Sequence, residues 1–486
     1  MSENGSGAAA GLEAVIGLEI HVQLATATKM FCGCELSFGE PPNTHTCPVC
    51  LGLPGSLPVA NARAVHFGLM IGLALGSELA PRSIFHRKNY FYPDLPKGYQ
   101  ISQYDEPLCL GGRLADIRIH RVHLEEDAAK LIHVGASGRI HGSDASLVDF
   151  NRGGTPLAEI VTEPDLRTPE QAGEWLRLLR STLRALGVSD VNMEEGSLRC
   201  DANISLRRAG SDTFGVKTEL KNMNSFRFIE RGIRAEIARQ ADVIEGGGSV
   251  VQETLHFDPD SGSITSLRSK EEAHDYRYFP EPDLLPVAID AAMLDAARAA
   301  MPELPAERAE RLQREHGLSS DSVRLLAFRA ELGAYFEDAL AAGAKPAPEP
   351  QALANWVTGE LITRLPDGED PASSRVAPAA LAELVGLVGD KHVTVGAARQ
   401  VLDRLVAEGG GAAAIVEAEG LGALGGGDEL EAVVAAAIAA NGEAAERVRA
   451  GNAKAIGPIV GHVMRETKGR ADGTEVARLI NAQLGV

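Results

Sequence analysis

The sequence lacks the features of several common classes of protein. Six cysteines among 486 residues are too few for a disulfide framework, so their grouping matters more than their number. Lysine and arginine total 47 against 67 acidic residues, which gives a formal charge of −20. That negative charge argues against a protein that binds nucleic acid or membrane through its overall electrostatic field. It leaves room for a local basic patch, because screening limits charge effects to roughly 10 Å at moderate salt.

A long apolar run and a targeting segment are also missing. The most apolar stretch, around residues 64–75, is interrupted by His66, Gly68 and Gly72 and is too short to span a bilayer. Residues 1–11 are rich in Ser, Gly and Ala and predict a disordered tail rather than a signal peptide. We therefore expect a cytoplasmic protein that binds neither membrane nor DNA. No Gly-x-x-x-x-Gly-Lys-Ser/Thr motif occurs, so any nucleotide is not held by a P-loop.

The segment Val15 to Leu24 has the pattern of a β-strand with one polar face. From Leu18 onward apolar and polar residues alternate, which buries one face of the strand. The other face carries Glu19 and His21, with same-face neighbours roughly 6.6 Å apart. A carboxylate beside an imidazole can ligate a metal or hold a proton. It can also simply decorate a solvated sheet, and one strand alone does not distinguish these cases.

Four later segments, residues 118–127, 157–163, 198–207 and 216–221, repeat this strand pattern with polar side chains. Like charges on neighbouring strands repel unless a cation or proton lies between them. Mg²⁺ suits such a group, since it takes carboxylate oxygens together with the phosphates of a nucleotide. The candidate magnesium ligands are Glu19, His21, Glu126, Glu159 and Asp201.

Two further expectations concern the packing around these strands. The alternation in residues 198–207 has no fault, so Cys200 should point into the core and act as a small apolar side chain. A helix is expected from about Phe226 to Gln240, and Ser225 can accept a hydrogen bond as its N-cap.

Two close pairs of cysteines lie in the loop of residues 30–52, which is rich in Gly, Pro and Asn. Four thiolates suit a tetrahedral structural Zn²⁺ and leave no open position for chemistry. The first pair has a single intervening residue, which is tighter than usual, and four reduced thiols are the alternative. The predicted zinc ligands are Cys32, Cys34, Cys47 and Cys50.

Basic and aromatic residues alternate in the segment of residues 84–100, which prolines interrupt. Arg87, Lys88 and Lys97 are interleaved with Tyr90, Tyr92 and Tyr99. Such a mixture can bind phosphate and stack on a base. Aromatic side chains that pin a long loop to a core are an equally good explanation.

The composition changes after about Asp290, where Ala, Leu, Glu and Arg predict helices. A glycine-rich joint at residues 409–411 opens a last helical module. From Ala445 to Val486 the sign of the charge reverses, with seven basic residues against four acidic ones. A solvated surface of mixed charge is the alternative to an RNA-binding element.

Long ordered runs of this sequence resemble the B subunits of the bacterial aspartyl/glutamyl-tRNA amidotransferases, and the resemblance covers nearly the whole chain. The runs are residues 15–22, 87–94, 124–127, 149–160, 193–203, 219–222, 275–282 and 451–458. The resemblance implies an α+β fold: an antiparallel-sheet cradle domain (residues 12–295), an all-α helical domain (296–408) and a small α-helical tail domain that binds tRNA (409–486).

The same resemblance implies a function. The chain would use ATP to phosphorylate the side-chain carboxylate of misacylated Glu-tRNA(Gln) or Asp-tRNA(Asn), and ammonia would then displace the phosphate. It would work in a heterotrimer whose other members are an amidase (glutaminase) and a small third protein. We expect ATP, Mg²⁺ and structural Zn²⁺ as cofactors. The implied catalytic residues are His21, Glu126, Glu159 and Lys88, the cofactor-binding ones Lys88, Lys97 and Arg199, and the tRNA-binding ones Lys454, Arg465 and Lys468.

Two other classes of function stay open at this point. The chain could be a non-catalytic tRNA-binding scaffold, or a stand-alone metal-dependent hydrolase. The repeated polar strand faces argue against the scaffold, and the absence of a Ser-Ser-Lys amidase pattern argues against the hydrolase.

Overall fold

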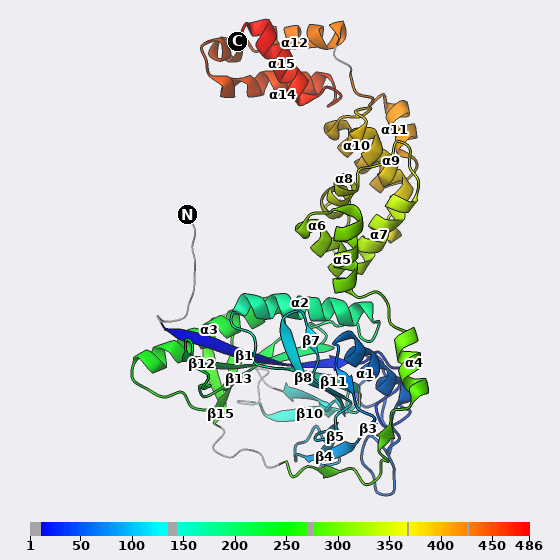
Figure 1. The fold of residues 1–486 in the computed structure, drawn as a ribbon, viewed down its shortest axis with the longest axis vertical. Helices are drawn as coiled ribbons and strands as arrows, with labels where there is room; N and C mark the ends of the chain where they lie inside the picture. Colours follow the sequence, from blue (N-terminus) through cyan, green and yellow to red (C-terminus); the bar gives the residue numbers. More distant parts are fainter. Residues whose placement is uncertain (1–10, 135–142, 260, 270–275, 367–368, 425–426) are drawn as a thin grey trace. The chain divides into compact units, whose positions relative to one another are not determined.

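The computed structural model describes residues 11–134, 143–259, 261–269, 276–366, 369–424 and 427–486. The chain divides into two compact units, Met1–Leu304 and Pro305–Val486. The first is built around a sheet and the second is helical (Figure 1), which confirms the α+β class. The predicted disordered tail falls almost wholly outside the described residues. No described helix is both long and apolar enough to cross a membrane.

A ten-stranded sheet forms the centre of the first unit, in the order β15-β14-β13-β12-β1-β11-β8-β6-β2, with β7 paired to β8. All neighbours are antiparallel except β13 and β14. The strands are β1 (Leu12–Gln23), β2 (Glu78–Leu79), β6 (Cys109–Leu110), β7 (Arg113–Leu114), β8 (Ile117–Glu126), β11 (Pro156–Thr162), β12 (Leu198–Arg208), β13 (Thr218–Met223), β14 (Glu253–Phe257) and β15 (Ile264–Ser269).

Three small sheets complete the unit. One has the order β16-β4-β5, and the other two are the pairs β9–β10 and β17–β3. Their strands are β3 (Arg82–Ser83), β4 (Phe85–Asn89), β5 (Tyr99–Gln103), β9 (Lys130–Val134), β10 (Ala145–Asp149), β16 (Phe279–Pro280) and β17 (Val287–Ala288). The predicted loop of basic and aromatic residues is therefore a hairpin, because β4 and β5 pair with each other.

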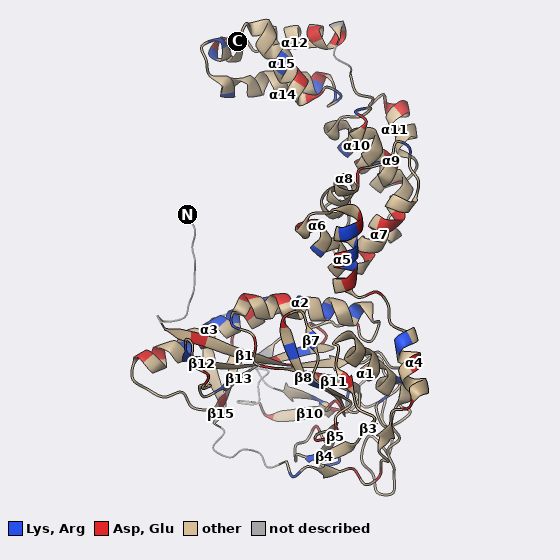
Figure 2. Cartoon of the chain, in the orientation of Figure 1, with Lys and Arg blue, Asp and Glu red and all other residues tan. Residues whose placement is uncertain are grey.

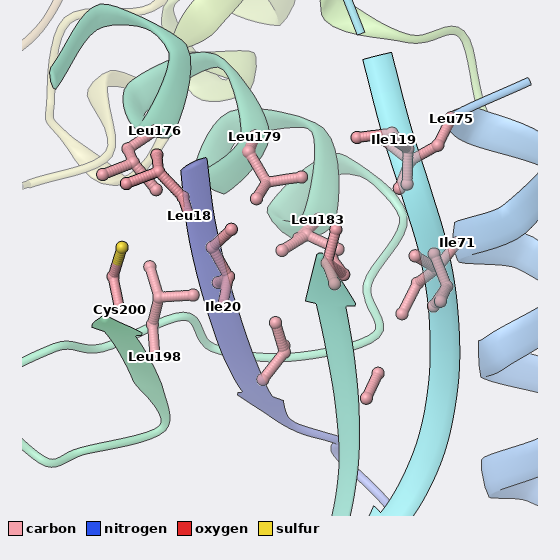
Figure 3. Close-up of a cluster of buried hydrophobic side chains, with 14 of the residues drawn as sticks. Leu18, Ile20, Ile71, Leu75, Ile119, Leu176, Leu179, Leu183, Leu198 and Cys200 are labelled. Carbon is pink, nitrogen blue, oxygen red and sulfur yellow. The ribbon is translucent and has the colours of Figure 1, made fainter. Parts of the chain in front are cut away.

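Three helices, α1 (Ala62–Ala74), α2 (Pro169–Ala185) and α3 (Phe226–Glu245), cover the apolar face of the sheet. Leu18 and Ile20 of β1 pack in the same core as the leucines of α2 and Ile71 of α1 (Figure 3). These side chains are almost completely buried, and each such burial contributes about 1.5–3 kcal/mol. Cys200 lies in this core, as the strand pattern predicted.

The helix termini follow the local sequence. Ser225 accepts a hydrogen bond from the backbone N–H of Phe228 and begins α3, which confirms the predicted N-cap. Thr168 and Gln171 form a capping box at the start of α2. A last helix, α4 (Ala291–Ala299), packs against α1 and so belongs to the first unit.

Two hydrophobic cores lie within the helical unit, and each is formed by consecutive helices. The first core belongs to α5 (Pro305–His316), α6 (Ser320–Phe328), α7 (Ala330–Ala341), α8 (Pro350–Asn355), η1 (Trp356–Leu361), η2 (Pro371–Ser373), α9 (Pro378–Gly389), α10 (Val395–Glu408) and α11 (Ala412–Glu419). The second belongs to α12 (Asp428–Ala440), α13 (Gly442–Arg449), η3 (Ala453–Ile456), α14 (Gly457–Glu466) and α15 (Gly473–Leu484).

The tail module therefore starts later than the glycine-rich joint suggested. Ala412 and Leu421 are buried in the first helical core, so α11 belongs there. The glycines at 409–411 form the turn between α10 and α11. The second core begins with Leu430, which places the start of the module near residue 427.

Candidate functional site

Two buried carboxylates and two imidazoles meet in the middle of the polar face of the large sheet. His21 on β1 lies opposite Glu159 on β11, which in turn lies opposite His123 on β8. Glu125 comes two residues after His123 and so points to the same side. We call these four residues, His21, His123, Glu125 and Glu159, the carboxylate–imidazole cluster.

The four side chains are close enough to interact with one another. Nε2 of His21 lies 3.5 Å from Glu159 Oε2 and 3.6 Å from Glu125 Oε1. Nε2 of His123 lies 3.1 Å from Glu159 Oε2 and 3.8 Å from Glu125 Oε2. Each imidazole thus faces both carboxylates. Ligand atoms of His21, Glu125 and Glu159 all lie within 4.8 Å of one another, as a shared cation requires.

The protonation states in this cluster balance its charges. Burial opposes a charge on His123, yet Glu159 and Glu125 raise its pKa to about 9. Burial likewise opposes a charge on His21, but the same two carboxylates raise its pKa. Against burial, the neighbouring histidines hold the pKa of Glu159 well below its usual value. In the absence of metal, protons on the imidazoles therefore compensate the charge of the two carboxylates, and a divalent cation can do the same.

Glu126, which the sequence placed in the magnesium shell, lies away from this cluster. It shares the strand parity of Val122 and Leu124, whose side chains point into the core. Its carboxylate accepts hydrogen bonds from the backbone N–H of Ile101 and from Lys97 Nζ. The structure therefore puts Glu125 where Glu126 was expected. It also places Lys97, a predicted cofactor ligand, in this ion pair rather than beside His21.

Glu19 and Asp201 lie on the polar face but in the next row of the sheet. They are opposite each other on β1 and β12. Glu19 accepts a hydrogen bond from Asn203, and Asp201 forms an ion pair with Lys221. The structure thus brings His21 and Glu159 together as predicted, while these two carboxylates have partners of their own.

Two predicted cationic residues flank the cluster. Lys88 on β4 is half-buried, and although burial opposes its charge, Glu125 and Glu159 help to raise its pKa. Arg199 lies opposite His21 on β12 and donates a hydrogen bond of 2.7 Å to Asp127. Positive charge is therefore available on both sides of the buried carboxylates.

The four predicted zinc ligands also come together. The sulfur atoms of Cys32, Cys34, Cys47 and Cys50 lie within 4.8 Å of one another. We call them the cysteine quartet. A hydrogen bond from Cys32 lowers the pKa of Cys50 to about 4 against the effect of burial, and the charge of Lys29 assists. The quartet therefore already favours a thiolate beside three further sulfur ligands.

The surroundings of the Lys29 side chain indicate whether the four thiols suit a metal. Its side chain is only 1% exposed, and its Nζ donates to the carbonyl of Phe150 at 3.0 Å and contacts Cys50 Sγ at 3.7 Å. No carboxylate in the described part of the chain forms an ion pair with it. A buried ammonium is costly unless an anion compensates it. A metal bound by four thiolates carries net negative charge and would provide that anion.

A turn connects the cysteine loop to the polar face of the sheet. Asn43 and His45 of the loop donate backbone N–H groups to Asp149 and Asn151, at 3.1 and 2.8 Å. At the other end of the turn, the N–H of Gly154 donates to the carbonyl of Asp127. Asp127 accepts the hydrogen bond from Arg199. The cysteine loop therefore positions Asp127, and through it Arg199, by a chain of hydrogen bonds.

Comparisons with known proteins identify the family of this chain. A family model described as the GatB/GatE catalytic domain matches residues 14–295, and one described as the GatB domain matches residues 334–484. The B subunit of the aspartyl/glutamyl-tRNA(Asn/Gln) amidotransferase of Anaeromyxobacter sp. (strain K) is 50% identical over 97% of this chain and 99% of its own length. The chain belongs to the GatB family.

Other GatB relatives are equally similar. The proteins of the same name from Frankia casuarinae and Salinispora tropica are 50% and 51% identical, over 98% of this chain and 96% and 97% of their own lengths. The resemblance that the sequence motifs suggested is thereby confirmed. The carboxylate–imidazole cluster and the cysteine quartet both lie within the match to the catalytic domain.

The predicted tRNA-binding residues lie in the tail module of the chain. Lys454 in η3, Arg465 in α14 and Lys468 after α14 are all exposed. Figure 2 shows acidic residues at the start of α12 and basic residues among the later helices. Exposure makes these cations available to a ligand, but their role stays a prediction.

The charge balance of the cluster gives a prediction about pH. A cation that binds His21 must displace any proton on its ring, and the two carboxylates raise the pKa of His21 and raise the pKa of His123 to about 9. Mg²⁺ affinity should therefore rise with pH up to about pH 9, the pKa of His123, by about tenfold per pH unit for each proton released. Calorimetry in buffers of different ionisation enthalpy measures this release.

A neighbouring histidine on the same strand provides the control. His120 is exposed and pairs with Glu163 outside the cluster. His120→Gln should leave the proton release unchanged, whereas His123→Gln should reduce it. Mg²⁺ binding without any proton release would contradict the charge balance described above.

Proposed function

We propose that this chain activates the amino acid in a glutamine-dependent tRNA amidotransferase. It would transfer the γ-phosphate of ATP to the side-chain carboxylate of Glu-tRNA(Gln), Asp-tRNA(Asn) or both. Ammonia would then attack the acyl phosphate, form the amide and release phosphate. The observation that carries this proposal is the carboxylate–imidazole cluster, which places buried ligands for a divalent cation in the middle of the sheet.

The chemistry explains why such a cluster is needed. A carboxylate is a poor electrophile until one of its oxygens becomes a leaving group, and phosphorylation provides one. Bringing a triphosphate to a carboxylate collects negative charge in one place. Mg²⁺ held by His21, Glu125 and Glu159 would neutralise part of that charge when bound.

The cations of the chain would act on the substrates themselves. Lys88 faces the two carboxylates and can neutralise a phosphate oxygen. Arg199 is held by Asp127 on the other side of His21 and can orient a second phosphate. Lys97 was expected to share this task, but because it forms an ion pair with Glu126 we propose that it supports β5 and β8 instead.

The relatives are named as the B subunit of an amidotransferase, which indicates an enzyme of several subunits. We infer that this chain works in a heterotrimer with an amidase, which releases ammonia from glutamine, and with a small third protein. The tail module would hold the misacylated tRNA. A scaffold that only binds tRNA would not require buried carboxylates arranged to bind a cation.

We also assign a structural Zn²⁺ to the cysteine quartet. Four sulfur ligands fill its coordination shell and leave no position for substrate. The buried ammonium of Lys29 would balance part of the negative charge. Zinc would stabilise the loop of residues 30–52 and, through the turn at 149–154, the position of Asp127.

Removing one carboxylate of the cluster should stop the chemistry. Glu159→Gln and Glu125→Gln should each lower tRNA-dependent ATP hydrolysis at least about 100-fold, because the phosphoryl group loses its cation. The glutaminase activity of the amidase should survive at least in part. Both activities are measured on the assembled enzyme.

Two variants serve as controls for this experiment. Glu163→Gln, near the end of the same polar strand but paired with His120, should keep full activity. Glu126→Gln should act through the stability of the fold, since it leaves Lys97 without its partner. Normal amide formation by Glu159→Gln would overturn the assigned role.

Metal content tests the cysteine quartet. The protein should contain about one Zn²⁺ per chain, which Cys47→Ser should lose and Cys109→Ser should keep, because Cys109 lies in the core. Lys29→Met removes no ligand but removes the balancing charge, so a chelator should extract zinc about tenfold more easily. Equal zinc content in the two cysteine variants would refute the site.

Deletion of the tail module should weaken tRNA binding without unfolding the rest. Without residues 427–486, the Michaelis constant for misacylated tRNA should rise while turnover at saturation falls less. Lys468→Ala should lower the slope of log affinity against log salt by roughly 0.7–0.9. Lys391→Ala is a matched control, since both residues are exposed and have positive φ. Unchanged tRNA affinity after the deletion would exclude the module as the RNA-binding element.

A further inference from the structure

Five tyrosines form a continuous series of ring contacts beside the carboxylate–imidazole cluster. Tyr92 stacks on Tyr90 with centroids 5.8 Å apart, and Tyr90 meets Tyr276 at 6.4 Å. Tyr276 meets Tyr278 at 6.0 Å, and Tyr278 stacks on Tyr104 at 4.2 Å with the rings only 7° from parallel. We call this series the tyrosine ladder.

The ladder is a local concentration in a chain that has few aromatic residues. Only 5% of residues are aromatic and only seven are tyrosines, so the ladder uses five of the seven. Its members come from the β4–β5 hairpin, from the residue that follows it and from the segment that leads into β16. Segments far apart in the sequence therefore meet to build it.

The middle of the ladder lies next to the candidate chemistry. Lys88 Nζ is 5.0 Å from the centre of the Tyr276 ring. Burial raises the pKa of Tyr278, and the charges of Lys88 and Glu125 act on the same phenol. The ladder thus leads to the lysine that we expect to meet phosphate.

The two ends of the tyrosine ladder are exposed to solvent, unlike aromatic side chains that pack in a core. Tyr104 is 49% exposed although Tyr278 covers one of its faces, and Tyr92 is 37% exposed. Phe91, between two members of the ladder, is 88% exposed. Aromatic side chains that only pinned the hairpin to the core would be buried. Exposed aromatic rings beside a cation are instead the usual platform for unpaired bases.

We propose that the tyrosine ladder stacks on the unpaired 3′-terminal bases of the aminoacyl-tRNA. The inference rests on the proposed function. The amino acid is esterified to the terminal ribose, so its carboxylate reaches Glu159 only if the last nucleotides lie beside the cluster. Several rings in series suit several unpaired bases, whereas ATP would need only one.

The test uses the assembled enzyme and an RNA minihelix that ends in CCA, with 2-aminopurine in place of the terminal adenine. Stacking on a tyrosine should quench the fluorescence of this base. Tyr104→Leu and Tyr92→Leu should reduce the quenching and weaken minihelix binding about 5- to 100-fold each. Tyr104→Phe keeps the ring and should restore both signals.

Phe38→Leu is the matched control, because Phe38 is an exposed ring (78%) of the cysteine loop for which no ring contact is found among the described residues. It should bind the minihelix as the wild type does. Unchanged quenching in both tyrosine variants would overturn the proposal. So would a rise in the Michaelis constant for ATP with normal minihelix binding, which would assign the ladder to ATP. Loss of the amidase or the small third protein in size-exclusion chromatography would make the ladder a protein interface instead.

The proposed function has its own readout in the same experiment. Wild-type enzyme should hydrolyse ATP when misacylated tRNA is added. If it does so while the tyrosine variants bind normally, only the ladder proposal fails. If the wild type shows no tRNA-dependent hydrolysis, the function itself fails.

Discussion

Two buried carboxylates side by side require compensating positive charge, and the central sheet is arranged to meet that requirement. Glu125 and Glu159 each face His21 and His123 across three adjacent strands. Two protons on the imidazoles or one divalent cation provide the same charge. The site can therefore exist without metal and exchange protons for a cation. The apolar face of the same strands fixes the register that makes these contacts possible.

The cysteine quartet is connected to the carboxylate–imidazole cluster by a series of hydrogen bonds. The cysteine quartet and the buried Lys29 hold the loop of residues 30–52, which hydrogen-bonds to the turn at 149–154. That turn fixes Asp127, and Asp127 holds Arg199 beside His21. A metal bound by the quartet would thus affect the position of Arg199 without contacting any substrate.

Strand alternation predicted much of this site from the sequence, because the polar face of a strand can be read from residue parity. His21, Glu159 and Arg199 were placed correctly on that face, and the quartet was evident from its spacing. Glu126 was predicted as a magnesium ligand, although Glu125 and Asp127 stand beside it at the end of β8. Parity with Val122 and Leu124 would have excluded Glu126. The contact of Glu125 with His21, by contrast, depends on the pairing order of β8, β11 and β1, which no local pattern contains.

One divalent cation should bind between His21, Glu125 and Glu159. Mn²⁺ can replace Mg²⁺ at such sites and scatters X-rays anomalously, so a crystal of the enzyme grown with Mn²⁺ tests the claim directly. We expect an anomalous peak within bonding distance of His21 Nε2 and of an oxygen of Glu159, which Glu159→Gln should abolish. A peak between Glu19 and Asp201, or beside Glu126, with none at His21 would contradict it.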